Sequence, residues 1–201
     1  TNSDKLTKAV AKIKELETPV SKDYVVTLTD STTNGKVAAG ENVTLNVQLD
    51  GTMLDVKMVQ YSIEYDPTEF TASTKTSGAN KLPACFEADW WSYVSDGKGI
   101  GYVAKPKVGI KADPDNSAHS LLSVVILDEG VIDEYSDIKD ATTTSVGKII
   151  FTAAKDIDDV SKCFTIKKQK VQILVGDSGK DQTVTAKQLV SKATPADPDK
   201  E

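Results

Sequence analysis

The feature that most constrains this chain is a run of alternating side chains that ends at a proline. Large apolar residues occupy every second position: Val59, Tyr61, Ile63 and Tyr65. The alternate positions carry Met58, Gln60, Ser62 and Glu64. Because successive side chains of a strand point to opposite faces, this pattern predicts a half-buried β-strand with a core face and an outer face. Asp66-Pro67 ends the strand, since proline lacks the N–H group that a sheet ladder needs.

Other segments also have strand character. Strands are predicted at residues 24–28, 43–49, 99–104, 120–127, 146–153, 164–166, 171–175 and 182–186. Residues 105–118 and 128–146 are predicted as surface loops, and residues 176–181 as a turn. About nine short strands separated by turns, with little helix, predict an all-β fold, specifically a two-sheet antiparallel β-sandwich.

The chain divides into three parts. Residues 1–20 are predicted as an N-terminal helix and linker, in which residues 3–17 carry an apolar stripe with helical spacing. Residues 21–193 form the sandwich, and residues 194–201 are a Pro/Asp linker by composition. We expect the chain to be a fragment of a larger protein. It contains no apolar run near the ~20 residues that span a bilayer, so membrane insertion is not predicted.

Charge excludes a nucleic-acid partner. The net charge is -6, and all 24 basic residues are lysines. Nucleic-acid binders normally combine a positive face with arginine forks, which this chain lacks.

Catalysis and metal binding are not predicted. The single histidine, His119, lies in a turn-rich segment and is interpreted as a solvated surface residue. The sequence 176–179 (GDSG) resembles the nucleophile loop of trypsin-like proteases, but no suitably placed base accompanies it. Asp113 opens a segment with calcium-like ligands that lacks the glycine and the bidentate glutamate of a calcium loop. We therefore predict no enzyme, no metal and no cofactor, although an acidic loop could hold a structural calcium ion.

Two cysteines leave two interpretations open. In an exported protein, Cys85 and Cys163 could form a disulfide across the sandwich. The alternative is two buried free thiols, which are common core residues, and the sequence gives no distance with which to decide.

An aromatic cluster is the sharpest candidate binding feature outside the alternating strand. Trp90 and Trp91 are adjacent, Tyr93 follows, and Tyr102 lies on the next predicted strand. Neighbouring strand residues point to opposite faces, so we expect Trp91 to be the more exposed of the pair, with Trp90 on the side of Phe86. An exposed tryptophan can anchor a protein interface, stack on a sugar ring, or lie against its own chain.

The pattern Gly40-x-x-Val43-x-Leu45-x-Val47-x-Leu49, followed by Tyr61-x-Ile63-x-Tyr65-Asp66-Pro67-x-x-Phe70, resembles the opening of a bacterial cohesin module. Cohesins are β-sandwiches with which cellulosome- or amylosome-type scaffolds hold dockerins. The resemblance covers roughly residues 37–186, and the segments 86–91, 96–102 and 147–153 match its later strands in order. It implies a cohesin-like jelly roll.

The resemblance also implies a function. A dockerin-bearing enzyme would bind across one sheet face, through Met58, Gln60, Ser62, Glu64 and Trp91. Negative charge on this face would meet a lysine- or arginine-bearing helix of the partner. The module would be part of a secreted, extracellular or cell-surface bacterial scaffold protein.

Two alternatives stay open. One is a carbohydrate-binding module for starch or a plant polysaccharide, with a stacking platform formed by Trp90, Trp91, Tyr93 and Tyr102. The other is a structural spacer or adhesin domain.

Overall fold

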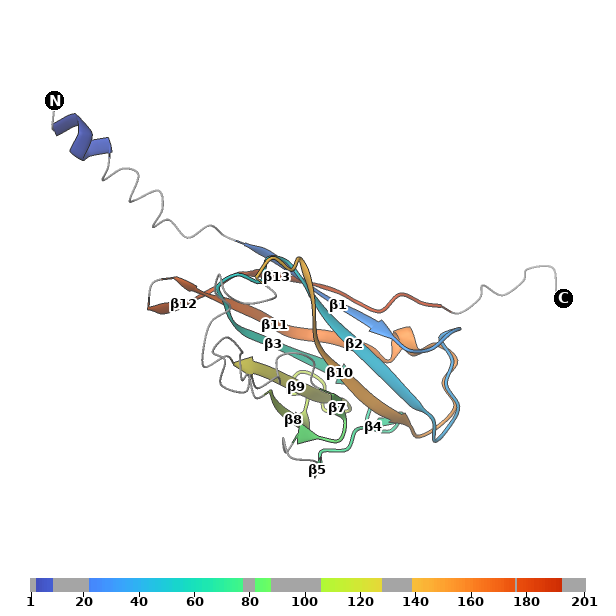
Figure 1. The fold of residues 1–201 in the computed structure, drawn as a ribbon. Helices are drawn as coiled ribbons and strands as arrows, with labels where there is room; N and C mark the ends of the chain where they lie inside the picture. The colour runs from blue at the N-terminus through green and yellow to red at the C-terminus, as the bar shows by residue number, and fades with distance from the viewer. Residues whose placement is uncertain are drawn as a thin grey trace, which may run out of the picture.

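The structure of the chain is a computed structural model that describes residues 3–8, 22–77, 82–87, 106–127, 139–175 and 177–192. Its strands form two sheets packed face to face (Figure 1). The first has the order β13 (Thr183–Lys187), β1 (Asp23–Asp30), β2 (Asn42–Asp50), β10 (Thr143–Ala153) and β4 (Phe70–Thr71), with β7 (Phe86–Glu87) also paired to β10. The second has the order β12 (Ser178–Asp181), β11 (Phe164–Val175), β3 (Val56–Tyr65), β9 (Ser120–Leu127) and β8 (Lys107–Ala112). A ribbon of β5 (Thr76–Ser77) and β6 (Leu82–Pro83) and a short 3-10 helix, η2 (Val160–Lys162), complete the described elements.

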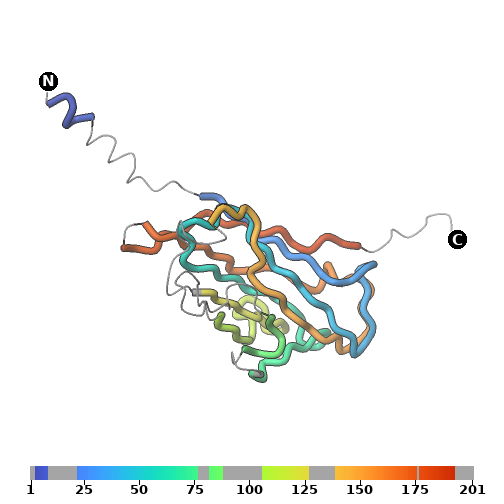
Figure 2. Tube along the Cα trace, in the orientation of Figure 1, coloured from blue at the N-terminus to red at the C-terminus, as the bar shows by residue number. Residues whose placement is uncertain are grey.

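The predicted all-β sandwich is confirmed. Thirteen strands occur in the described residues, and four of them, β4 to β7, have only two residues each. One strand pair departs from the antiparallel prediction, because β13 runs parallel to β1 with Thr183 opposite Asp23. Figure 2 shows the C-terminal part of the trace, in red, running beside the blue segment that contains β1.

Several predicted boundaries are wrong. Residues 107–112, expected in a loop, form β8, whose Val108 and Ile110 pack against the core. β10 begins at Thr143, inside another predicted loop, and β12 occupies much of the predicted turn at 176–181. The two strands expected at 164–166 and 171–175 form one continuous strand, β11. In each case pairing with a distant strand overrides the local turn-forming residues, because ladder hydrogen bonds are a tertiary property.

The ends of the chain are only partly described. Residues 3–8 are helical and exposed, and Leu6 of the predicted apolar stripe is 67% exposed. The rest of the predicted helix and the predicted linker at 194–201 lie outside the described residues. The described strands fall within residues 21–193, whose limits as a domain stay a prediction. None of the described helical segments is long and apolar enough to cross a membrane.

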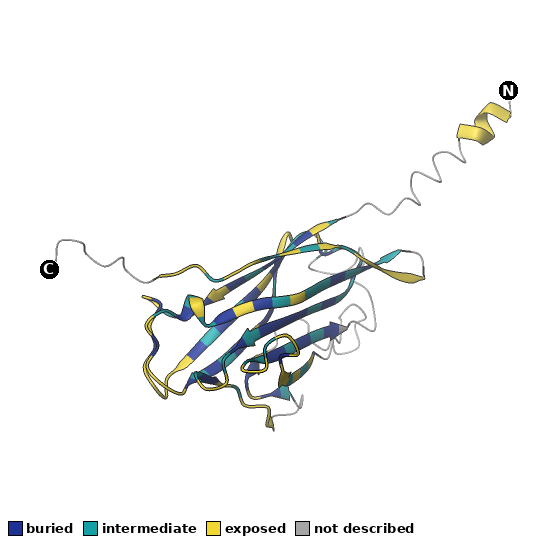
Figure 3. Ribbon diagram, turned by 180° about the vertical axis from the view of Figure 1, so that it is seen from behind, coloured by how far each residue is buried: buried dark blue, intermediate teal, exposed yellow. Residues whose placement is uncertain are grey.

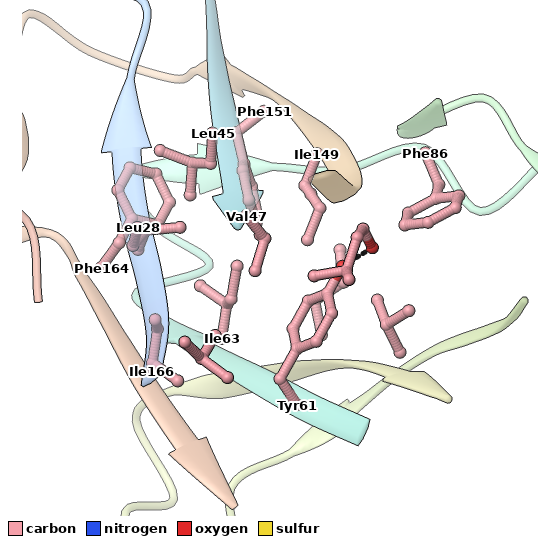
Figure 4. Close-up of a cluster of buried hydrophobic side chains, with 14 of the residues drawn as sticks. Leu28, Leu45, Val47, Tyr61, Ile63, Phe86, Ile149, Phe151, Phe164 and Ile166 are labelled. Carbon is pink, nitrogen blue, oxygen red and sulfur yellow. Dashed lines mark hydrogen bonds between the residues drawn. The ribbon is translucent and has the colours of Figure 1, made fainter. Parts of the chain in front are cut away.

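The core lies between the sheets and follows from the period-two patterns. Buried and more exposed residues alternate along the strands (Figure 3). Val59, Tyr61 and Ile63 of β3 are fully buried. They face fully buried side chains of β2, and Figure 4 shows Leu45 and Val47 approaching Tyr61 and Ile63 from the opposite sheet.

The Tyr65-Asp66-Pro67 corner ends β3 as predicted. The Asp66 carboxylate accepts hydrogen bonds from the backbone N–H and the hydroxyl of Thr68, both at 2.7 Å, and these bonds lower the pKa of Asp66. The Asp66 carbonyl accepts the N–H of Phe70 at 3.0 Å. This turn returns Phe70 to the core, where its ring lies 4.6 Å from that of Phe164 between centroids.

One buried hydrogen bond crosses the sandwich. The Tyr61 hydroxyl, from the second sheet, donates to the Val146 carbonyl of β10 in the first sheet, at 2.9 Å. Val146 lies in a β-bulge between Ser145 and Gly147, which frees its carbonyl from the ladder with β2. Gly147 has a φ of 133°, and a Cβ there would lie 2.5 Å from the Phe86 ring. Glycine is therefore required both by the backbone and by the packing.

The cysteines do not form the disulfide that the sequence left open. Cys85 and Cys163 are both free. Cys85 is buried beside β7 of the first sheet, whereas the Cys163 thiol at the start of β11 lies 3.5 Å from the Asp159 carbonyl. Burial raises the pKa of both thiols, that of Cys163 to about 12, so neither is an activated nucleophile.

Gly147→Ala is predicted to destabilise the sandwich by about 3 kcal/mol, because it combines an unfavourable φ with overpacking against Phe86. Urea denaturation measures the change. Gly109→Ala is the matched control, since a Cβ at Gly109 meets nothing within 4 Å. We expect the control to stay within about 1 kcal/mol of the parent protein. Equal effects of the two substitutions would contradict the assignment.

Candidate functional site: the outer face of the second sheet

The predicted partner-binding residues of β3 lie on the side of the second sheet that faces away from the core, here called the outer face. Strand register fixes their neighbours, because directly paired residues share a face. Gln60 lies between Lys170 of β11 and Val125 of β9. Ser62 lies between Lys167 and Ser123 in the same way. β3 is thus the central strand of the candidate site.

The outer face is less exposed than the sequence suggested. Met58 and Gln60 are half-buried, as expected for the middle of a sheet. Ser62, predicted to face solvent, is only 2% exposed, and its hydroxyl shares a hydrogen bond of 2.8 Å with that of Ser123. The Glu64 side chain is only 11% exposed. The binding role of these residues stays a prediction, but two of them are held by their own chain.

Glu64 belongs to a charge cluster that the sequence did not reveal. The cluster consists of Glu64, Asp113, His119 and Lys167. The Lys167 ammonium lies 2.7 Å from one Glu64 oxygen and 3.0 Å from an Asp113 oxygen. The His119 Nδ1 lies 3.0 Å from the other Glu64 oxygen. Glu64 is therefore not the unpaired negative charge that was expected to face a basic partner helix.

The turn between β8 and β9 brings this cluster together. The Asp113 N–H donates to the His119 carbonyl at 2.9 Å, which closes the turn. One Asp113 oxygen accepts the Asp115 N–H at 2.9 Å, leaving the other for Lys167. The Asp115 N–H and then Lys167 lower the pKa of Asp113, while hydrogen bonds to Glu64 and Asp113 raise the pKa of Lys167. Both groups are therefore charged at neutral pH.

His119 is the residue that sequence reasoning missed. It was interpreted as a solvated surface side chain, yet it bonds Glu64 from 55 residues away. The available signal was its place just before the strand at 120–127. An antiparallel pairing of that strand with the one at 57–65 places His119 beside the C-terminal end of β3.

The residues of the turn that resemble calcium ligands accept hydrogen bonds from backbone N–H groups. Besides Asp113, Asn116 accepts the N–H of Ala118 through its side-chain oxygen, at 3.3 Å. Among the described residues, no group of three or more His, Cys, Asp or Glu side chains is placed to hold a metal ion.

A second polar feature lies away from the outer face. A hollow of about 310 Å³ is lined partly by Glu41, Asp156 and Asp158. Asp156 accepts the Ala39 N–H at 2.8 Å and Glu41 accepts the Ala38 N–H at 3.1 Å. Because these carboxylates stabilise the adjoining loop, we interpret the hollow as structural.

The aromatic candidates Trp90, Trp91, Tyr93 and Tyr102 lie outside the described residues. Their exposure, and the expectation that Trp91 faces outward, stay predictions. The aromatic side chains that the structure does describe are buried in the core, as Phe86 and Tyr61 illustrate.

Sequence comparison finds no relative: no protein-family model matches the chain, and no curated protein matches it. Solved structures do match. The second type II cohesin module of the adaptor scaffoldin ScaA from Acetivibrio cellulolyticus is 15% identical, with 82% of this chain and 87% of that chain covered and a TM-score of 0.50. The type II cohesin A11 from Bacteroides cellulosolvens is 16% identical, covering 81% and 95%, with a TM-score of 0.49. The sixth cohesin of scaffoldin B from Acetivibrio cellulolyticus, solved in complex with a dockerin, is 14% identical, covering 82% and 95%, with a TM-score of 0.42.

The comparison concerns the fold, and it rests on the ScaA module. At this identity a structural match establishes architecture rather than activity. The chain has a cohesin-like fold, as the sequence resemblance implied.

Lys167→Met is predicted to lower the melting temperature at pH 7, because it leaves two carboxylates facing each other in a poorly solvated site. Asp113 has a lowered pKa, so its stabilising effect is present above its ordinary pKa of about 4 and is lost as pH falls through the lowered value. The deficit should therefore shrink near pH 3. Thermal denaturation followed by circular dichroism at both pH values measures it.

Lys170→Met is the matched control. Lys170 pairs with Asp181 on the same sheet, but both side chains are substantially exposed, at 40% and 61%. Such surface pairs contribute little, so the melting temperature should barely change. A deficit in Lys167→Met that is no larger than in the control, or that is independent of pH, would show that the cluster is not stabilising.

Proposed function

We propose that this cohesin-like β-sandwich is a non-catalytic protein-binding module of a secreted bacterial scaffold or cell-surface protein. It binds a dockerin-bearing protein across the outer face of the second sheet. The observation that carries the proposal is the position of β3: the strand that bears the sequence resemblance is central in a five-stranded sheet whose outer side faces away from the core.

The chemistry of this face suits a protein partner. Met58 offers a half-buried apolar side chain at one end of β3, and Gln60 offers amide hydrogen bonds next to it. On β9, half-buried Val125 flanks Gln60. A half-buried apolar centre with polar neighbours is the usual composition of a protein interface. Trp91 would extend this surface if it faces outward.

The rigidity of the face also supports binding. The Ser62–Ser123 hydroxyl pair and the charge cluster fix side chains that would otherwise lose rotamer freedom when a partner docks. Ordering these groups during folding removes part of the entropic cost of association. In this proposal the side chains of the charge cluster hold the contact surface in place and do not contact the partner themselves.

Met58→Asp is predicted to weaken dockerin binding at least about tenfold, because a carboxylate at an apolar contact must be desolvated without a partner. Isothermal titration calorimetry against purified dockerin modules measures the affinity. Asn46→Asp is the matched control, since Asn46 is half-buried on the far side of the other sheet. The control variant should bind normally.

The same experiment tests the alternative. Soluble starch and glucans are titrated in parallel, with Trp91→Ala as a further variant. If the parent protein binds a glucan but no dockerin module, and Trp91→Ala abolishes glucan binding, the proposal is wrong and the carbohydrate-binding interpretation replaces it. Absence of binding to both ligand classes would favour a spacer or adhesin role.

A further inference from the structure

We propose that the outer face selects a dockerin surface rich in carboxylates, which it contacts through two lysines on the β8 edge of the sheet. This inference rests on the proposed function and reverses the charge that the sequence suggested for the partner. It is based on which charged side chains of the outer face form ion pairs within the described part of the chain and which do not.

The carboxylates of the outer face are already bonded to lysines of the chain. Glu64 and Asp113 share Lys167 in the charge cluster. Asp181, at the β12 edge, lies 3.1 Å from the Lys170 ammonium and also accepts a hydrogen bond from Gln172 at 2.6 Å. A basic partner would have to compete with these internal partners for every negative charge on the strands of this sheet.

Two lysines on β8 have no such partner. Lys107 and Lys111 are exposed, and neither makes an ion pair or a hydrogen bond with any part of the chain that the structure describes. Their direction is fixed, because Val108 and Ile110 between them pack against the core. With about 3.3 Å per residue, their backbones lie roughly 13 Å apart along the edge strand.

The two lysines border the centre of the outer face. Lys107 is paired with Val125 of β9, which is paired with Gln60 of β3, so Lys107 and Gln60 lie about 10 Å apart across the sheet at the usual strand spacing. Met58 lies on the same face of β3 as Gln60. A partner that buries an apolar contact there brings its own rim over the lysines, where carboxylates gain charge-assisted hydrogen bonds.

The net negative charge of the whole chain increases the selectivity for one docking orientation. The chain as a whole carries a net charge of -6, which repels an acidic partner from most orientations. Local positive charge on one face then favours a single docking orientation. Electrostatic complementarity of this kind contributes mainly to specificity and association rate.

The test uses a double charge reversal, Lys107→Glu with Lys111→Glu, in the full chain. The matched control is Lys148→Glu with Lys187→Glu, since both residues are exposed on the first sheet and the net charge changes equally. The dissociation constant for a dockerin module that binds the parent protein is measured at low and high salt. We expect at least about tenfold weaker binding for the first double variant at low salt, a smaller loss at high salt, and little change for the control.

An uncharged double variant separates charge from folding. Lys107→Gln with Lys111→Gln removes both cations at exposed positions, so the melting temperature should barely change while affinity falls. Unchanged or tighter binding of both the charge-reversed and the uncharged double variants would overturn this inference and leave the proposed function standing. Failure of the parent protein to bind any dockerin module would instead overturn the proposed function, and this inference with it.

Discussion

The hydrogen bond between Tyr61 and the Val146 carbonyl couples the two halves of the sandwich. A phenol can be buried this deeply only if its hydroxyl has a partner, and burial also raises its pKa so that it stays protonated. The partner exists because β10 bulges at Ser145, and the bulge in turn requires a glycine that leaves room for Phe86. Hydrophobic burial draws the sheets together without specifying their alignment. This directional contact aligns β3 with β10 (Figure 4).

The outer face inherits its geometry from that alignment. With Tyr61 fixed inward, Gln60 and Ser62 must point outward, because strand side chains alternate. β9 and β11 then pair on either side and bring Ser123 and Lys167 next to Ser62. The orientation of the side chains on the candidate binding surface therefore follows from the way Tyr61 packs in the core.

On the outer face, whether a charged side chain has an ion-pair partner depends on how deeply it is buried. Carboxylates that the fold removes from water are paired with lysines, since an unpaired buried charge is strongly destabilising. The lysines left over lie on exposed positions, where charge costs little and is available to a partner. Stability and the proposed binding therefore use different lysines: the Lys167 ammonium bonds the buried carboxylates, whereas Lys107 and Lys111 are the exposed lysines that we propose contact the partner.

The sequence by itself determined the sandwich, the strands at 43–49 and 57–65 and the corner at Asp66-Pro67, because alternation and a missing N–H are local properties. It missed β8, where Gly109 and flanking turn formers conceal a pattern that only pairing with β9 completes. Only the tertiary structure decided that His119 meets Glu64, that the cysteines stay apart, and that Glu64 is already bonded to a lysine of its own chain. Each of these depends on contacts between residues far apart in the chain, and a period of two records which face a side chain occupies but not which neighbour it finds there.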